Sequence, residues 1–367
     1  MRKISLYLML LTSAAFIASC DKSKNVQLHT IIHEDGRCER EVSYHTVMSK
    51  EERDSLWAGD NVQWAYPLPE YLNTDAFMGT HTDVEGDTVT TTFSNIFNSV
   101  EEMCQKTPLN LNGSRIKSKA SLEKRFRWFY TEYTYTETFI SVADSFKLPA
   151  TDYADKDVIS YWFTGQPNLM QGLTGSEVSQ KISKMEEQVD QWFNDNFYQS
   201  VFEYMVDNYD SIPNPPISKE RFVALRDSFY HNIIGKSEMM LLNHEIQDNY
   251  RDFYHSNAYA DFFNDETPLG EGLSDKLYTH FNIFSFDVPY VLTMPGKVWD
   301  PGTGIVMDGA VYYQLTGERL IPGDYTITAT SRVTHIWAYA LAILIILVAI
   351  GSFIYRGKAK RMGQTES

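Results

Sequence analysis

The sequence predicts an α+β fold held between two hydrophobic ends. Segments with period-two alternation lie toward both ends of the 367-residue chain, and they flank a block whose apolar residues recur every three or four positions. A final uncharged run, from Ile336 to Tyr355, is followed by a basic tail. We therefore expect a small antiparallel sheet domain with a large helical insertion, plus one C-terminal transmembrane helix.

The first strands are predicted from alternation on either side of a turn. Val26 to His33 and Cys38 to Val47 alternate in the manner of strands, and Glu34-Asp35-Gly36 between them is typical of a hairpin turn. Lys50 to Trp57 has room for a short helix.

Further elements follow before the helical block. Thr88 to Phe93 has the composition of a strand, and Ser99 with Glu102 forms a capping-box pattern that predicts a helix through Lys106. Phe126 to Ile140 is dense in aromatic residues and threonine, which predicts one long strand.

The block 154–264 has the helical period. Its clearest helix is Gly175 to Tyr209, which Thr174 and Glu177 cap and Pro213 ends. Shorter helices are expected at Ser218 to Ile234, Met239 to Tyr250 and Asp252 to Phe263.

Strand patterning returns after the helical block, at Asp287 to Met294, Ile305 to Leu315 and Tyr325 to Val333. The predicted organisation is a signal peptide (1–19), a first part of the α+β ectodomain (20–153), the helical insertion (154–264), a second, β-rich part (265–335), the transmembrane helix (336–355) and a cytoplasmic tail (356–367).

The N-terminus has the features of an export signal. Two basic residues precede a short apolar core, and Ile17-Ala18-Ser19-Cys20 resembles the cleavage box of bacterial lipoproteins. We expect Cys20 to become the lipid-modified N-terminus. The alternative is an ordinary secretory signal in which the cysteine is incidental.

The C-terminal apolar run is long enough to cross a bilayer, since 20 helical residues span about 30 Å. Trp337, Tyr339 and Tyr355 lie at its edges, where aromatic rings favour the membrane interface, and the basic tail predicts a cytoplasmic end. A buried core helix is the alternative. Both anchors are expected in one bilayer, the cytoplasmic (inner) membrane of a bacterium, with the ectodomain outside.

Charge excludes some partners. Outside the flanking segments the chain has 26 basic and 47 acidic residues, a net charge near −21. Such a surface repels nucleic acid and anionic headgroups, so no nucleic-acid partner is expected. Basic partners and divalent cations remain open, beside the plainer interpretation of a solvated acidic surface.

Two cysteines remain after Cys20. Cys38 and Cys104 form an even pair in an exported, oxidising compartment, where a disulfide between them would enclose 65 residues and contribute roughly 4 kcal/mol. The alternative is two unpaired buried thiols.

No catalytic or metal-binding motif emerges from the sequence. His29 and His33 share a predicted strand, which separates them by about 13 Å. His244-Glu245 is followed by Asp248 rather than a second histidine, so the zinc-protease pattern is absent. We predict no catalytic residue, no metal and no cofactor.

Aromatic residues are the most distinctive class, at 14% of the chain. They either line an apolar or glycan-facing groove or form the interface between the insertion and the sheet. The residues concerned are Trp128, Tyr130, Tyr133, Tyr135, Phe139, Trp192, Phe193, Phe197 and Phe202.

Several short motifs are similar to those of the LppM-like envelope lipoproteins. They are the strand pair around Asp35-Gly36, then Met294-Pro295-Gly296-Lys297-Val298, then Asp308-Gly309 before Val311-Tyr312-Tyr313-Gln314-Leu315, a last strand at 325–333 and a closing membrane helix. The resemblance covers 26–141 and 287–355. It implies a small, BON-like domain outside the cytoplasmic membrane with a role in handling envelope lipids, and the block 154–264 departs from it.

The function expected from these features is that of a non-enzymatic, inner-membrane-anchored lipoprotein whose ectodomain binds an envelope lipid, glycan or protein partner. Its first partner is the lipid bilayer, at both ends. The alternatives are an envelope hydrolase with a carboxylate site and a structural subunit of a membrane complex.

Overall fold

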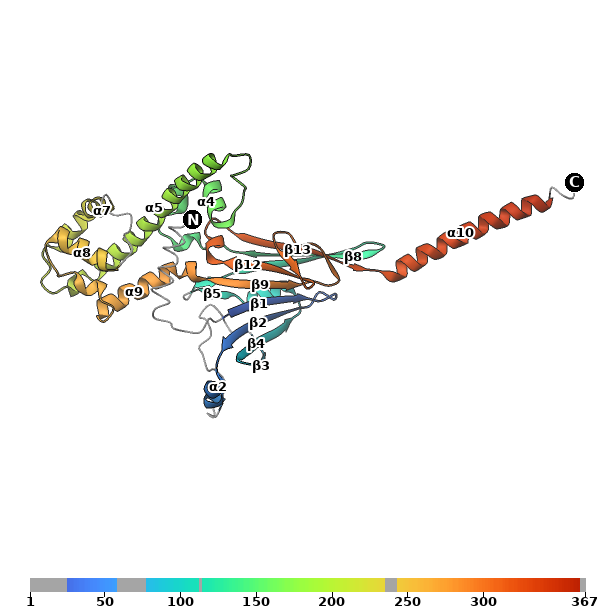
Figure 1. Ribbon diagram of the computed structural model, residues 1–367, viewed down its shortest axis with the longest axis horizontal. Helices are drawn as coiled ribbons and strands as arrows, with labels where there is room; N and C mark the ends of the chain where they lie inside the picture. Colours follow the sequence, from blue (N-terminus) through green and yellow to red (C-terminus); the bar gives the residue numbers. More distant parts are fainter. Residues whose placement is uncertain (1–24, 58–76, 112–113, 235–242, 364–367) are drawn as a thin grey trace.

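The computed structural model describes residues 25–57, 77–111, 114–234 and 243–363. Two packed β-sheets form a central body, here called the sandwich (Figure 1). A group of helices, the helical lobe (143–285), lies at one end of the sandwich, and the long helix α10 (Ile336–Gly363) leaves from the opposite end.

The larger sheet has the strand order β11-β12-β9-β1-β2-β4-β3 within the described residues. The predicted hairpin is present, since β1 and β2 pair from Asn25↔His45 to Ile32↔Cys38. On its other side β1 pairs in parallel with β9, so the sheet is mixed. The strands are β1 (Asn25–Ile32), β2 (Cys38–Val47), β3 (Gly79–Glu85), β4 (Thr88–Phe97), β9 (Asp287–Thr293), β11 (Ile305–Met307) and β12 (Ala310–Thr316).

The smaller sheet is antiparallel, with the order β10-β13-β8-β7. Its two central strands pair over their whole length, from Tyr130↔Thr334 to Phe139↔Tyr325. The strands are β7 (Ser118–Phe126), β8 (Tyr130–Phe139), β10 (Lys297–Asp300) and β13 (Tyr325–Thr334). Beside the sheets lie the pair β5 (Leu109–Leu111) and β6 (Ser114–Ile116), with helices α2 (Lys50–Trp57) and α3 (Val100–Lys106).

Alternation places the core of the sandwich between the two sheets. Every second residue of β8, from Thr131 to Phe139, is buried, and the inner faces of β1, β2 and β9 supply Leu28, Val42 and Leu292. Tyr133, Tyr135 and Phe139 belong to this core.

The helical lobe has a second core of its own, rich in aromatic residues. Helix α5 begins with the predicted capping box of Thr174 and Glu177 and runs for 33 residues. Its apolar stripe buries Trp192, Phe197 and Phe202. The helices are α4 (Lys156–Thr164), α5 (Gly175–Asp207), α6 (Lys219–Ala224), α7 (Arg226–Ile234), α8 (Asn243–Tyr254) and α9 (Pro268–Phe281), with 3-10 turns at Ala143–Ser145, Ala150–Asp152, Tyr209–Ser211, Ala260–Phe263 and Asn282–Ser285.

The aromatic residues singled out in the sequence thus divide between two cores. Tyr133, Tyr135 and Phe139 of β8 pack inside the sandwich, and the rings of α5 pack inside the lobe, where Phe193 is partly buried. Neither the predicted groove nor a single interface between insertion and sheet describes them, because each part of the fold buries its own rings. Trp128, which is exposed, and Tyr130, which is partly buried on the outer face of β8, belong to neither core.

The helical segment extends beyond the predicted boundary at 264. Helix α9 lies where the β-rich part was expected to begin, and its Leu273 and Phe281 are buried in the core of the lobe. The sequence did not predict this helix because it contains Gly270 and Gly272, and glycine lowers helix propensity. Packing explains the first of them, since a Cβ at Gly270 would lie 2.0 Å from the carbonyl oxygen of Asn264.

The single strand expected at Phe126 to Ile140 is wrong. The chain instead forms the hairpin of β7 and β8, in which the Arg127 N–H donates to the Tyr130 carbonyl at 2.8 Å and only Trp128 and Phe129 lie between them. These turn residues are neither Gly, Pro, Asn nor Asp, so the sequence carries no ordinary turn signature there. Ile305 to Leu315 is likewise a hairpin, turning at Asp308 and Gly309 in the left-handed region.

The predicted α+β class is confirmed, and so is the presence of an apolar C-terminal helix. The sheet part is larger than expected: two packed sheets with one parallel strand pair replace a small antiparallel sheet. Strands β3, β7 and β10 are additions to the predicted set.

The chain leaves the sandwich for the lobe and returns at neighbouring points. The Val142 N–H donates to the Leu320 carbonyl at 3.0 Å, and the Gly317 N–H donates to the Phe286 carbonyl at 2.9 Å. Both ends of the lobe are therefore held by the 3-10 turn Gly317–Leu320, which makes the lobe an insertion with two adjacent connections.

We predict that replacing 143–285 by a short Gly/Ser linker leaves a folded sandwich, because the two cores are separate. Replacing only 154–264 should give an aggregation-prone protein, since α9 would keep Leu273 and Phe281 without the α5 side of their core. Near-UV circular dichroism and size-exclusion chromatography of the detergent-solubilised chains measure both. Equal behaviour of the two deletions would contradict the boundary at 143 and 285.

Candidate functional site

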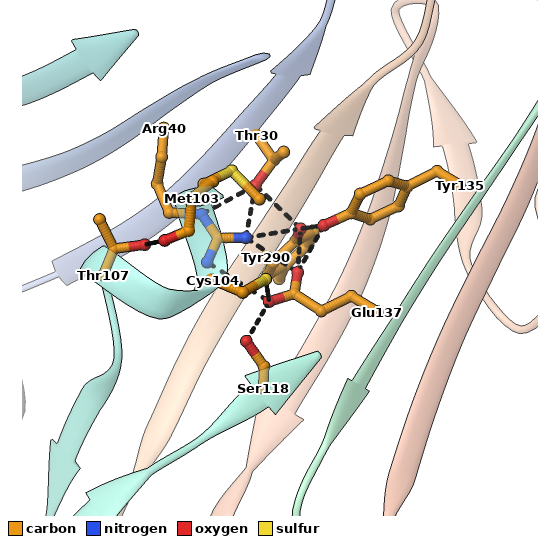
Figure 2. A network of polar contacts seen from close by, with 9 residues as sticks. All are labelled: Thr30, Arg40, Met103, Cys104, Thr107, Ser118, Tyr135, Glu137 and Tyr290. Atoms are coloured by element: carbon orange, nitrogen blue, oxygen red, sulfur yellow. Dashed lines mark hydrogen bonds and ion pairs between the residues drawn. The ribbon is translucent and has the colours of Figure 1, made fainter. Parts of the chain in front are cut away.

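A network of polar side chains lies in the centre of the sandwich (Figure 2). Arg40 comes from the inner face of β2 in the larger sheet, and Glu137 comes from the inner face of β8 in the smaller one. Both positions alternate with buried apolar neighbours, so each strand directs one charge into the core. Thr30 of β1 and Tyr290 of β9 complete the side of the larger sheet.

The two charges meet as a close ion pair. One terminal nitrogen of Arg40 lies 2.8 Å from Glu137 Oε2, and the other lies 3.3 Å from Oε1. The same guanidinium donates to Thr30 Oγ1 at 3.0 Å and to the Tyr290 hydroxyl at 3.2 Å. The guanidinium is thus surrounded by acceptors, as a buried cation requires.

Several hydroxyl groups converge on the carboxylate, as Figure 2 shows. Ser118 donates to Glu137 Oε1 at 2.7 Å, and Tyr135 donates to Oε2 at 2.7 Å. Tyr290 lies 2.7 Å from Oε2, and the Cys104 thiol donates to Oε1 at 3.4 Å. Strands β7, β8 and β9 and helix α3 therefore all reach one carboxyl group.

The environment keeps both partners charged. Burial alone would raise the pKa of Glu137, but the Arg40 charge and the hydrogen bonds from Arg40, Ser118 and Tyr135 outweigh it and lower the pKa to about 2. Burial would lower the pKa of Arg40, and the Glu137 charge reverses this and raises it. Burial also raises the pKa values of Tyr135 and Tyr290, which remain neutral donors.

This network has no access for a substrate, because the side chains of Arg40 and Glu137 are 1% and 0% exposed. The ion pair and the hydroxyl groups around it can hold the two sheets in one alignment. They cannot exchange protons with a bound molecule, because they are buried. We therefore interpret the network as the structural centre of the fold.

We predict that Glu137→Gln destabilises the protein by roughly 3 to 5 kcal/mol, because it leaves the buried Arg40 charge unpaired. Arg40→Met should cost a similar amount, and the double variant Arg40→Met/Glu137→Met should cost clearly less than the sum of the two. Denaturant unfolding of the detergent-solubilised chain, followed by tryptophan fluorescence, gives the three values. Simple additivity would contradict the coupling.

The same pair predicts a pH dependence. The folded pKa of Glu137, about 2, lies below its usual 4.5, so its stabilisation is complete above about pH 4.5 and is lost as the pH falls toward 2. In the Glu137→Gln variant this contribution to the acid-induced loss of stability should be absent.

A second polar group lies on the outer face of the larger sheet. His29 Nδ1 lies 3.0 Å from Glu41 Oε2, and His29 Nε2 lies 2.9 Å from the hydroxyl of Thr293. The three residues come from neighbouring strands, since β1 pairs with both β2 and β9. A hydroxyl, an imidazole and a carboxylate in this order are the components of a nucleophile relay. The side chains of His29 and Glu41 are partly exposed.

The base of α10 is fixed to the sandwich by charge and ring contacts. Arg332, near the end of β13, forms an ion pair with Glu132 at 2.8 Å. Its guanidinium also lies 3.8 Å from the ring centre of Trp299 and 4.5 Å from that of Tyr130. Side chains of β8 and β10 thus both contact β13, the strand that continues into α10.

Helix α10 contains a stretch, Ile336–Tyr355, that is long and apolar enough to cross a membrane. Nearly all of this stretch is exposed in the isolated chain, so it is no core helix of the folded body. Figure 1 shows it projecting away from the sandwich. These are the properties that the transmembrane interpretation requires.

The predicted cysteine sites have different outcomes. Cys20, the expected lipidation site, lies outside the described residues. Cys38 and Cys104 are buried free thiols, which is the second of the two alternatives that the sequence left open. Burial raises the pKa of Cys38 to about 12 and also raises that of Cys104, so the thiolate forms that could act as nucleophiles or metal ligands are disfavoured.

Among the described residues, no group of three or more His, Cys, Asp or Glu side chains is arranged to hold a metal ion.

The central ion pair was not predicted from the sequence, although a cue was present. Arg40 and Glu137 are each a single charged residue on the apolar face of an alternating strand.

The fold and its polar groups define a two-sheet sandwich with an inserted helical lobe and an apolar C-terminal helix. No protein-family model matches the chain, and no curated protein or solved structure shows a significant match to it. The similarity to LppM-like lipoproteins and the BON-like shape therefore stay predictions from sequence motifs.

Proposed function

We propose that this chain is a membrane-anchored, non-enzymatic binding protein that presents its helical lobe to a partner at a distance from the bilayer. The observation that carries the proposal is the placement of α10 and the lobe at opposite ends of the sandwich (Figure 1). With Ile336–Tyr355 in a membrane, the lobe is the part farthest from it. Lipidation of Cys20 and location in the cytoplasmic membrane belong to the same proposal.

Charge supports the lobe as the binding part. Residues 143–285 contain 23 acidic and 10 basic residues, a net charge of −13, which is more than half of the excess near −21 outside the flanking segments. A field of this sign repels an anionic membrane surface and attracts basic proteins.

The packing of the lobe favours a protein partner over a lipid or a glycan. Lipid and glycan sites use exposed apolar or aromatic linings, whereas the aromatic rings of α5 lie in the lobe core. In the described part of the lobe, the exposed large apolar side chains are only Leu173, Val223 and Tyr278, so its outside is mainly polar and charged. We therefore infer that the partner is a protein with a basic surface.

We predict that removing three negative charges from the lobe, in the variant Asp261→Asn/Glu266→Gln/Glu271→Gln, weakens partner capture several-fold. These side chains are exposed, so the fold should be unaffected. The measurement is quantitative mass spectrometry of proteins that co-purify with the full chain, at low and at raised salt, because screening should weaken the same contact.

The matched control neutralises exposed acids of β3 and its turn, in the variant Asp83→Asn/Glu85→Gln/Asp87→Asn. Capture should survive this change. A partner set that responds equally to both variants, or to neither variant and not to salt, would refute binding through the acidic lobe.

A second candidate function is hydrolysis, favoured by the relay of Thr293, His29 and Glu41. In this role Thr293 would be the nucleophile, His29 its base and Glu41 the group that orients the imidazole. We rank it second because the three residues lie on the outer face of a sheet.

The hydrolase candidate predicts turnover of an activated ester panel that is lost in His29→Ala. His45→Ala is the matched control, because His45 also contacts a threonine hydroxyl, that of Thr90, at 2.8 Å on the same sheet. Turnover that is absent, or equal in both variants, would eliminate the candidate.

A further inference from the structure

The turn between β7 and β8 exposes three large aromatic side chains next to α10. Phe126, Trp128 and Phe129 are 62%, 51% and 38% exposed, although they lie close together at the end of a hairpin. A folded domain normally buries side chains of this size. Figure 1 shows the start of β8, at the tip of its hairpin, beside the start of α10.

Each of these rings contacts a ring at the start of the apolar helix. The ring centres of Phe126 and His335 lie 5.1 Å apart, those of Trp128 and Trp337 lie 5.6 Å apart, and those of Phe129 and Tyr339 lie 4.8 Å apart. We call these six residues the aromatic collar.

Backbone contacts fix the collar in place. The His335 N–H donates to the Phe129 carbonyl at 2.8 Å, and the His335 ring lies 2.9 Å from the hydroxyl of Thr131. The turn therefore cannot move independently of the first turn of α10. Its depth relative to any membrane is the depth of residues 335–339.

We propose that the aromatic collar inserts into the interfacial layer of the outer leaflet, so that the β7–β8 turn is a second membrane contact beside α10. This rests on the proposed membrane crossing of Ile336–Tyr355. If that stretch occupies the hydrocarbon core, the collar lies at its outer boundary, where Trp and Tyr are enriched and where apolar rings leave water.

Charge around the turn agrees with a lipid occupant. Lys124, Arg125 and Arg127 are exposed and precede or enter the turn, in a chain whose net charge is −16. Arg125 also pairs with Glu123 at 2.9 Å, so Arg127 and Lys124 supply the excess of positive charge. Basic side chains next to an aromatic turn suit a layer that contains anionic headgroups. The acidic lobe, at the other end of the sandwich, has the opposite preference.

The contact has a consequence for orientation. A single helix allows the ectodomain to tilt and rotate about its base. A second contact through the collar restricts the tilt, because the turn and the helix enter the interface side by side and must stay at the same depth. The sandwich is then held in one orientation, with the lobe directed away from the bilayer.

The test uses the full chain in liposomes of phosphatidylethanolamine and phosphatidylglycerol, with the photoreactive residue p-benzoylphenylalanine at one position at a time. The positions are Trp128 in the collar, Ile345 in the middle of the apolar helix, and Tyr278, an exposed ring on α9 in the lobe. Lipid adducts after irradiation are quantified by mass spectrometry, and near-UV circular dichroism confirms that each variant is folded.

We expect phospholipid adducts at Trp128 and Ile345, and several-fold fewer at Tyr278. Adducts at Ile345 without lipid adducts at Trp128 would overturn the collar while leaving the anchor intact. Absence of adducts at both positions would overturn the membrane crossing, and with it the collar.

Discussion

The sandwich depends on the ion pair between Arg40 and Glu137. Each charge is fixed to a different sheet, so neither is compensated unless the two sheets meet in one alignment. A slip of one residue in β2 or β8 would turn that side chain to the other face and leave the opposite charge alone in the core. A buried pair of this kind contributes less to stability than its Coulomb attraction implies, because both groups lose water. We interpret its role as specificity: apolar side chains supply the driving force, and the pair selects the alignment.

The sandwich separates two ends of opposite character. One end has exposed rings and basic residues next to the apolar helix, and the other has a lobe with a net charge of −13. These properties agree with a bilayer on one side and a soluble partner on the other. The acidic lobe would be repelled by an anionic bilayer surface, and the exposed rings at the other end would be unfavourable in water. The two separate cores suit this arrangement as well, because the lobe can vary without disturbing the sandwich.

Much of the fold was predictable from local pattern. Alternation predicts the hairpin of β1 and β2, a capping box predicts the start of α5, and hydropathy predicts α10. Each of these signals lies within a short stretch of consecutive residues. What escaped prediction depends on distant contacts. The turn at Trp128 and Phe129 contains no residue that favours turns. Gly270 argues against a helix in the sequence, and only its close packing against Asn264 explains why a glycine stands there. The pairing of Arg40 with Glu137 spans 97 positions, and Thr293 and His29 meet across 264.

The pairing of β8 with β13 has a mechanical consequence. The lobe is attached just after Phe139, at one end of β8, and α10 is attached just after Thr334, at the opposite end of β13. Tension between a partner on the lobe and the membrane would therefore pull these two neighbouring strands lengthwise past one another. Their whole hydrogen-bond ladder would be loaded at once in shear, rather than opened one bond at a time. The architecture is thus suited to bearing force along its long axis.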